Sequence, residues 1–241
     1  MLSITKSLFA NLVNLFIDAI FPIPLAEQWI LNTPKEGIFK ILPRAYKSPI
    51  PESFSIFSYK DEKVWRLVWS IKYKKSKQAS TLAGFALHRF IKIFTQVIPN
   101  TTESNVIIPN IIVIPMPVSK QRRRERGFNQ CELLTKEIEN LEQQKNLVDI
   151  KIIVINNLLV RKHHTSRQTL KDKSAREKSA LDLFDINENI HQKISASNSN
   201  FKNSTFIIID DVVTTGSTMK EAVLTMRKAG FQNTWGLSVA H

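Results

Sequence analysis

The most constraining stretch of this sequence is residues 206–218, which read FIIIDDVVTTGST. Four consecutive apolar residues are typical of a strand covered on both faces, as in a parallel sheet between two layers of helices. Two carboxylates, a hydroxyl-rich turn and the beginning of a helix follow directly. Because open α/β sheets bind ligands at the carboxyl ends of their strands, the sequence predicts a site that starts at Asp210.

The turn after the two aspartates has the composition of a phosphate-binding loop. It offers side-chain hydroxyls and backbone N–H groups, Gly216 can adopt a positive φ, and the predicted helix 217–230 begins here. Asp210 and Asp211 would then face the hydroxyls of a sugar that carries the phosphate, and carboxylates also suit a Mg²⁺ ion, bound directly or through water. The predicted phosphate-binding residues are Val213, Thr214, Thr215, Gly216, Ser217 and Thr218.

A purely structural interpretation of the aspartates is that they cap a helix. An uncompensated pair of acids at the end of a buried strand is costly, however, and such pairs are usually functional. The absence of Gly-Lys-Ser/Thr at the required spacing excludes a Walker A loop. The functional interpretation is therefore favoured.

A second apolar strand, residues 111–114, runs into the turn Pro115, Met116, Pro117 and Val118 and then into a basic stretch. Residues 120–126 contain one lysine and four arginines, and a predicted helix at 131–141 follows. A solvated charge run is the usual explanation of such a stretch. Because this one follows the carboxyl end of a strand, it is better explained as a binding site for an anion such as pyrophosphate.

Residues 54–77 carry aromatic side chains at helical spacing, beside a basic run. Two interpretations are open: the aromatics face the core and the lysines are solvated, or the two together bind single-stranded nucleic acid away from the aspartate loop. Helical aromatic spacing usually reflects packing, which favours the first. The aromatics are Trp65, Trp69 and Tyr73, and the lysines are Lys72, Lys74, Lys75 and Lys77.

Composition limits the class of protein only broadly. The 241 residues include 34 Lys and Arg against 21 Asp and Glu, and the net charge of +13 permits an anionic partner. A Lys-rich composition explains the same excess equally well. The single cysteine, Cys131, excludes both an internal disulfide and a cysteine zinc cluster within one chain, and it fits a cytoplasmic protein.

The N-terminal quarter differs from the rest of the chain. Residues 1–21 have the pattern of an amphipathic helix that is too polar to span a membrane, and prolines then punctuate the sequence to about residue 53. We therefore predict an N-terminal helical and Pro-rich segment at 1–53. An α/β domain at 54–241 follows, with a mostly parallel sheet flanked by helices and a last strand at 235–241.

Residues 206–218 resemble the signature of the type I phosphoribosyltransferases at every position compared. The PMP turn at 115–117 and the sequence RGFNQ at 126–130 are similar to the ComF-type competence proteins, and this resemblance covers most of the chain. Residues 158–161, LLVR, begin a segment that also matches that family. Its matching positions are Arg161, Thr165, Gln168, Leu170 and Arg176.

Two departures from the ComF pattern are visible. The family usually has an asparagine shortly after the second arginine of this segment, where this chain has Ser179 and Ala180. The family also carries a small zinc module with paired cysteines after a Phe-Pro dipeptide. Residues 21–22 are Phe-Pro but no cysteine follows within residues 1–53, so this segment is interpreted as a remnant of that module and no zinc is expected.

The resemblance implies the type I phosphoribosyltransferase fold and a site for phosphoribosyl pyrophosphate with Mg²⁺. Residues 213–218 would bind the 5′-phosphate, and Asp210 and Asp211 would bind the ribose hydroxyls and the metal. The pyrophosphate loop would comprise residues 115–120 with Arg124 and Arg126. The named residues of that loop are Pro115, Met116, Pro117, Val118 and Lys120, and a mobile flap at 161–178 would contribute Arg161, Thr165, Gln168 and Arg176.

Three functions remain open at this point. The chain could be a phosphoribosyltransferase of nucleotide metabolism or salvage, with an unidentified acceptor. It could be a cytoplasmic accessory of DNA uptake, in which single-stranded DNA or an uptake helicase is the partner, as the ComF resemblance implies. It could also be a phosphoribosyl pyrophosphate sensor without turnover. A homo-oligomer is compatible with each.

Overall fold

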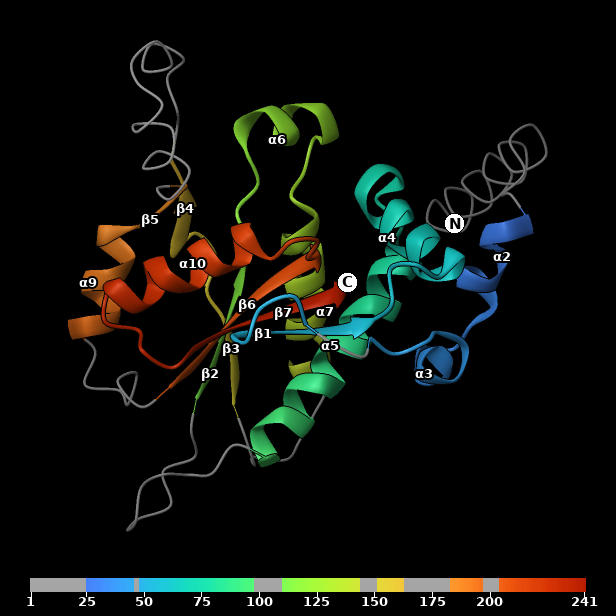
Figure 1. Cartoon of the computed structure of the whole chain (residues 1–241), viewed down its shortest axis with the longest axis horizontal. Coiled ribbons are helices and arrows are strands. Elements are labelled where there is room, and N and C mark those ends of the chain that lie inside the picture. The colour runs from blue at the N-terminus through green and yellow to red at the C-terminus, as the bar shows by residue number, and fades with distance from the viewer. Residues whose placement is uncertain (1–24, 46–47, 98–109, 144–150, 163–182, 197–203) are drawn as a thin grey trace, which may run out of the picture.

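The computed structural model describes residues 25–45, 48–97, 110–143, 151–162, 183–196 and 204–241, and its centre is a five-stranded sheet (Figure 1). All neighbouring strands pair in parallel, in the order β1-β7-β6-β2-β3. The predicted fold class is thereby confirmed. The strands are β1 (Ser53–Phe57), β2 (Ile111–Pro115), β3 (Ile152–Val154), β6 (Thr205–Val212) and β7 (Thr234–Ala240).

The strands alternate their side chains between two apolar layers, because successive residues of a strand point to opposite faces. Ile207 and Ile209 of β6 face one layer, formed with α4 (Glu62–Lys74), α5 (Lys77–Val97) and part of α7 (Gln130–Gln143). Phe206 and Ile208 face the other layer. That layer contains α9 (Glu188–Ala196), α10 (Ser217–Lys228) and the antiparallel pair β4 (Leu159–Arg161) and β5 (Phe184–Ile186). Figure 1 shows the sheet between these layers.

Residues 25–45 pack onto the same core as the sheet. Their elements are α2 (Leu25–Asn32), the short 3-10 helix Lys35–Gly37 and α3 (Ile38–Ile41). Ile30, Ile38 and Leu42 are buried against α4 and α5. The predicted division between residues 53 and 54 falls within β1, after its first residue.

None of the described helices is long and apolar enough to cross a membrane. The amphipathic helix predicted at 1–21 lies outside the described residues.

The register of β2 against β6 places their carboxyl ends together. Ile111 pairs with Thr205 and Pro115 with Ile209, so both strands end at the same edge of the sheet, as predicted.

The basic stretch beyond β2 forms a helix that was not predicted, α6 (Lys120–Arg126). Ser119 caps its N-terminus by accepting a hydrogen bond from the N–H of Arg122, and Gly127 ends it at φ +78°.

Candidate functional site

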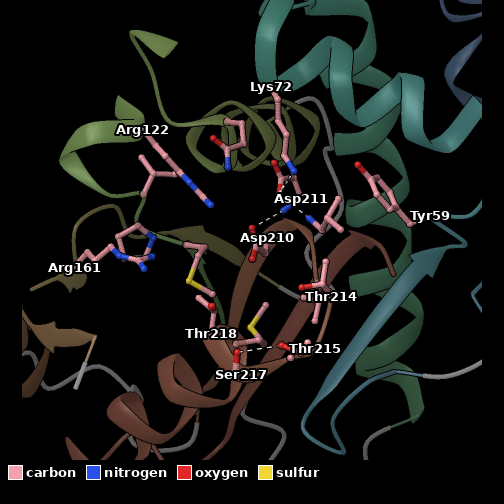
Figure 2. A pocket seen from close by; sticks show the side chains of 18 residues that line it. Tyr59, Lys72, Arg122, Arg161, Asp210, Asp211, Thr214, Thr215, Ser217 and Thr218 are labelled. Carbon is pink, nitrogen blue, oxygen red and sulfur yellow. Dashed lines mark hydrogen bonds and ion pairs between the residues drawn. The ribbon is translucent and has the colours of Figure 1, made fainter. Parts of the chain in front are cut away.

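A cavity of about 300 Å³ lies at the carboxyl ends of β2 and β6 (Figure 2). Its walls come from the segment between β1 and α4, α4 itself, the loop after β2, α6, the beginning of α7, the end of β4, the end of β6 and the turn that leads into α10. These elements are far apart in the sequence, and the fold brings them together at one edge of the sheet. The lining residues are Tyr59, Lys72, Met116, Pro117, Val118, Arg122, Gln130, Arg161, Asp210, Asp211, Val212, Val213, Thr214, Thr215, Gly216, Ser217, Thr218 and Met219.

The aspartate pair lies on the floor of the cavity. Asp210 Oδ1 accepts hydrogen bonds from the N–H of Asp211 at 2.8 Å and from the thiol of Cys131 at 3.5 Å. Burial, together with the neighbouring carboxylate of Asp211, raises the pKa of Asp210 to about 7. Because two acids in this setting disfavour full ionisation, the pair favours a ligand that brings positive charge or hydrogen-bond donors.

Asp211 is more deeply buried than Asp210 and forms an ion pair. Its side chain is 4% exposed, and its Oδ1 accepts from the N–H of Val212 at 2.7 Å and forms an ion pair with Lys72 at 3.3 Å. Its Oδ2 is buried and has no hydrogen-bond partner within the described part of the chain. A buried acceptor without a donor is rare in folded proteins, and it commonly marks the position of a ligand or water.

The hydroxyl-rich loop forms the wall beside α10. Gly216 adopts φ +80° and begins the helix without a capping bond from any described side chain, so the first N–H groups of α10 remain available to an anion. Thr214, Thr215 and Ser217 are exposed on the same loop, and the hydroxyls of Thr215 and Ser217 lie 3.1 Å apart. This arrangement of hydroxyls and amides suits a phosphate group.

The opposite side of the cavity is cationic. Arg122 of α6 and Arg161 of β4 both extend into it (Figure 2). Burial, together with the neighbouring Arg122, lowers the pKa of Arg161, whose guanidinium lies 5.4 Å from the ring centroid of Phe184. Neither arginine forms an ion pair with another described residue. Two guanidinium groups facing one cavity suit an anion with several oxygens.

The structure brings most of the predicted site residues together. The aspartates, residues 213–218, Arg161 and the turn residues 116–118 all line the cavity. Pro115 ends β2 and is outside the lining, as are Lys120, Arg124 and Arg126 of α6. The predicted flap residues Thr165, Gln168 and Arg176 lie outside the described residues, and so does most of the flap at 161–178.

Sequence reasoning missed several lining residues. Arg122 belongs to the predicted basic stretch, but only the helical geometry of α6 selects it from its neighbours. Tyr59 and Lys72 have no local signal, because only the packing of their segments onto the sheet brings them to the cavity. Gln130 belongs to the matching sequence RGFNQ, which by itself assigns it no role, and it accepts a hydrogen bond from Arg126 at 2.8 Å.

The aromatic residues of α4 do not face the core. Trp65 is 41% exposed and Tyr73 is 59% exposed, and both flank Trp69, with ring centroids 6.3 and 5.7 Å from it. The interpretation favoured by helical spacing is therefore wrong for Trp65 and Tyr73. The reason is that Val64, Leu67, Val68 and Ile71 already provide the buried face of this helix.

Cationic groups lie over each ring of this aromatic surface, which we define as Trp65, Trp69 and Tyr73. Arg66 lies 5.7 Å from Trp65, Lys74 lies 5.0 Å from Trp69, and Arg126 lies 5.3 Å from Tyr73. The sequence groups Lys72 with this surface, but its ammonium points to Asp211 in the cavity instead. This is a correction to the sequence-based grouping.

Comparison with known proteins agrees with the geometry. Residues 160–237 match the phosphoribosyl transferase domain family. The chain is 31% identical over 133 residues to Competence protein F of Haemophilus influenzae. The aligned region covers 53% of this chain and 50% of that protein. It is 31% identical over 121 residues to Competence protein ComFC of Bacillus subtilis. Here the aligned region covers 50% of this chain and 40% of that protein. The chain thus matches half or less of the length of these two relatives.

Proposed function

Because this chain is a ComF-type member of the type I phosphoribosyltransferase family, we propose that its cavity binds phosphoribosyl pyrophosphate together with Mg²⁺. One observation carries the proposal: a phosphate-type loop, a pair of carboxylates and a pair of arginines follow one another around a single cavity. Phosphoribosyl pyrophosphate has three parts of matching chemistry, namely a 5′-phosphate, a ribose diol and a pyrophosphate.

The 5′-phosphate would be bound by the loop 213–218 and the N-terminus of α10. Backbone N–H groups and the positive end of the helix dipole stabilise an anion at this position. Asp211 would accept a hydrogen bond from a ribose hydroxyl through its unpartnered Oδ2. Such a bond would satisfy a buried acceptor that is otherwise costly to leave without a donor.

The donor set around the aspartates fits Mg²⁺. Mg²⁺ is typically bound through one or two carboxylates, with substrate phosphates and water completing its shell. Within the described ranges no third His, Cys, Asp or Glu joins the pair to form a closed protein site. When bound, the ion would neutralise part of the negative charge on the pyrophosphate.

The reaction this site would support is displacement at C1 of the ribose. A nitrogen atom of the acceptor forms the new C–N bond while the C1–O bond breaks, and pyrophosphate departs with the bonding electrons. Arg122 and Arg161 would stabilise the charge that develops on the departing group, and the loop 213–218 would hold the sugar in place. The protein would supply positioning and positive charge rather than a nucleophile.

Calorimetry with phosphoribosyl pyrophosphate tests binding directly, with and without Mg²⁺. We expect saturable binding by the wild type and at least a tenfold loss of affinity in Asp211→Asn, because a carboxylate that accepts from a hydroxyl contributes more than an amide. Asp185→Asn is the matched control, since Asp185 is exposed and is not among the residues that line the cavity. Wild-type protein without measurable binding would overturn the proposal.

Turnover is a separate question that a second assay answers. Pyrophosphate release is measured against a panel of nucleobases and small amines, with the same protein and ligand concentrations. Release with one acceptor supports a transferase of nucleotide metabolism, whereas tight binding without release supports a sensor.

A second candidate function rests on the aromatic surface. We infer that the protein serves competence in the cytoplasm and that this surface contacts single-stranded DNA, or a helicase that handles it. Exposed rings with adjacent cations form stacking platforms for bases, and the net charge favours a polyanion. The two curated relatives are named competence proteins, which agrees with this role.

A further inference from the structure

Among the described residues that line the cavity, Lys72 is the only one supplied by α4, and α4 lies outside the matched domain at 160–237. Its ammonium Nζ lies 3.3 Å from Asp211 Oδ1, and both side chains are largely buried, 19% and 4% exposed. This pair joins the α4 layer to the end of β6. It is therefore distinct from the exposed ion pairs on the rest of α4, such as Arg66 with Glu62.

The position of Lys72 follows from how α4 packs. Val64, Val68 and Ile71 are fully buried in the core that α4 shares with the sheet. Lys72 follows Ile71 directly and therefore lies at the edge of this buried face of the helix. Lys75 then adopts φ 51° and ends the helix. Figure 2 shows the side chain of Lys72 extending from α4 toward Asp211 in the cavity.

The ion pair with Lys72 engages one oxygen of Asp211 and leaves the other without a partner among the described residues. Oδ1 is engaged twice, by the ammonium of Lys72 and by the N–H of Val212. Oδ2 is left buried and without a donor in the described chain. Two fixed contacts on one oxygen hold the carboxylate in a single orientation, and they keep its second oxygen free for a ligand hydroxyl.

We propose that Lys72 is a positioning residue that acts through Asp211 and presents Oδ2 to the ribose hydroxyls of the substrate. The inference rests on the proposed function of the cavity and deepens it, because it assigns part of the sugar site to a helix outside the matched domain. Lys72 itself does not contact the 5′-phosphate, which belongs to the loop 213–218.

The test compares ligands that do and do not need Asp211. Ribose 5-phosphate without Mg²⁺ reports the sugar site, and inorganic phosphate reports the loop alone. Lys72→Met is expected to lower the affinity for ribose 5-phosphate about tenfold or more, the effect of losing one hydrogen bond to a charged group, while phosphate binding changes little. Lys72→Arg should restore most of the affinity. Lys74→Met is the control, since Lys74 pairs with Glu27 away from the cavity.

A double-variant cycle separates positioning from direct contact. If Lys72 acts through Asp211, the change Lys72→Met has no further effect on ribose 5-phosphate affinity in an Asp211→Asn background. The double variant also removes both charges of the buried pair, so it remains measurable where Lys72→Met alone folds poorly.

Three outcomes overturn the inference. Unchanged ribose 5-phosphate affinity in Lys72→Met shows that the ion pair only joins two layers. An equal loss of affinity in both backgrounds shows that Lys72 contacts the sugar itself. Wild-type protein that binds phosphate but neither ribose 5-phosphate nor phosphoribosyl pyrophosphate contradicts the proposed function, and the inference falls with it.

Discussion

Ile50 lies against Gly216 so closely that a Cβ atom added to the glycine would be 2.6 Å from Cγ2 of Ile50. Pro49 adds a second contact, at 3.3 Å from the same position. The glycine begins α10 within the phosphate-type loop, whereas Ile50 precedes the first strand of the sheet. The Pro-rich segment before β1 therefore packs directly against the phosphate-type loop at Gly216.

Gly216→Ala should destabilise the fold and weaken phosphate binding together. The backbone at φ +80° costs an alanine about 1 kcal/mol, and the contact with Ile50 adds to that cost, so we expect a loss of about 2 kcal/mol or more in the free energy of unfolding. Urea unfolding and phosphate calorimetry measure the two effects.

Gly127→Ala is the matched control for that variant. Gly127 has a similar φ of +78°, but no atom of the described residues lies within 4 Å of an added Cβ. The loss of stability should therefore be limited to the backbone cost of about 1 kcal/mol. Equal losses in the two variants would show that the contact with Ile50 contributes nothing.

The parts of the fold that were predicted correctly are those with strong local patterns. The strand at 206–209 and the strand at 111–114 are continuous apolar runs, and each precedes a ligand-type turn, so their parallel pairing and common edge followed from general rules of α/β sheets. Short elements such as β3 and β4 contain three residues each and carry no comparable pattern.

The site was predictable where it is local and not where it is assembled by packing. Asp210, Asp211 and the loop 213–218 are contiguous, so one motif identifies them. Lys72 and Arg122 reach the cavity only because α4 and α6 are placed by the core and by capping. The exposed rings of α4 were misjudged for a related reason: helical spacing alone does not tell which of two stripes on a helix faces the core.

Arg122 and Arg124 should behave differently toward pyrophosphate, although they are two residues apart. Arg122 lines the cavity and Arg124 does not. Arg122→Gln is expected to weaken binding of phosphoribosyl pyrophosphate by about tenfold, since a charged hydrogen bond contributes about 1.5–3 kcal/mol. Arg124→Gln should bind as the wild type does, by calorimetry at the same ionic strength. A loss of affinity in Arg124→Gln but not in Arg122→Gln would instead support the sequence-based prediction that Arg124 binds the pyrophosphate.

The pH dependence of stability should carry the signature of Asp210. Its pKa rises from an ordinary value of 3.8 to about 7 in the folded chain, so the folded state holds a proton that the unfolded state releases. The contribution is fully present below about pH 4 and is lost as the pH rises through 7, with an upper limit of about 4 kcal/mol. Asp210→Asn should therefore flatten the decline in stability between pH 4.5 and pH 8.

Urea unfolding at these two pH values measures that effect. The variant should gain stability relative to the wild type at pH 8 and much less at pH 4.5. Asp185→Asn, a substitution of an exposed carboxylate, should leave the profile as it is. A constant difference between Asp210→Asn and wild type at both pH values would contradict the raised pKa.

The last prediction concerns the aromatic surface and single-stranded DNA. Base stacking on an exposed ring contributes about 1–3 kcal/mol per base, so Trp65→Ala with Tyr73→Ala should weaken oligothymidine binding by about tenfold or more. Replacing Lys74, Lys75 and Lys77 by glutamine should lower the slope of log affinity against log salt, by about 0.7 for each DNA phosphate that these lysines neutralise. Fluorescence anisotropy with a labelled oligonucleotide measures both quantities.

The controls for this prediction follow from the position of Lys72. Because its ammonium pairs with Asp211 inside the cavity, Lys72→Gln should affect sugar binding and leave the DNA affinity unchanged. Lys136→Gln, on an exposed part of α7 away from the aromatic surface, should change neither. If the ring variants bind DNA with the affinity of the wild type, base stacking on Trp65 and Tyr73 is excluded. An unchanged salt slope in the lysine variant would mean that Lys74, Lys75 and Lys77 do not contact the DNA backbone.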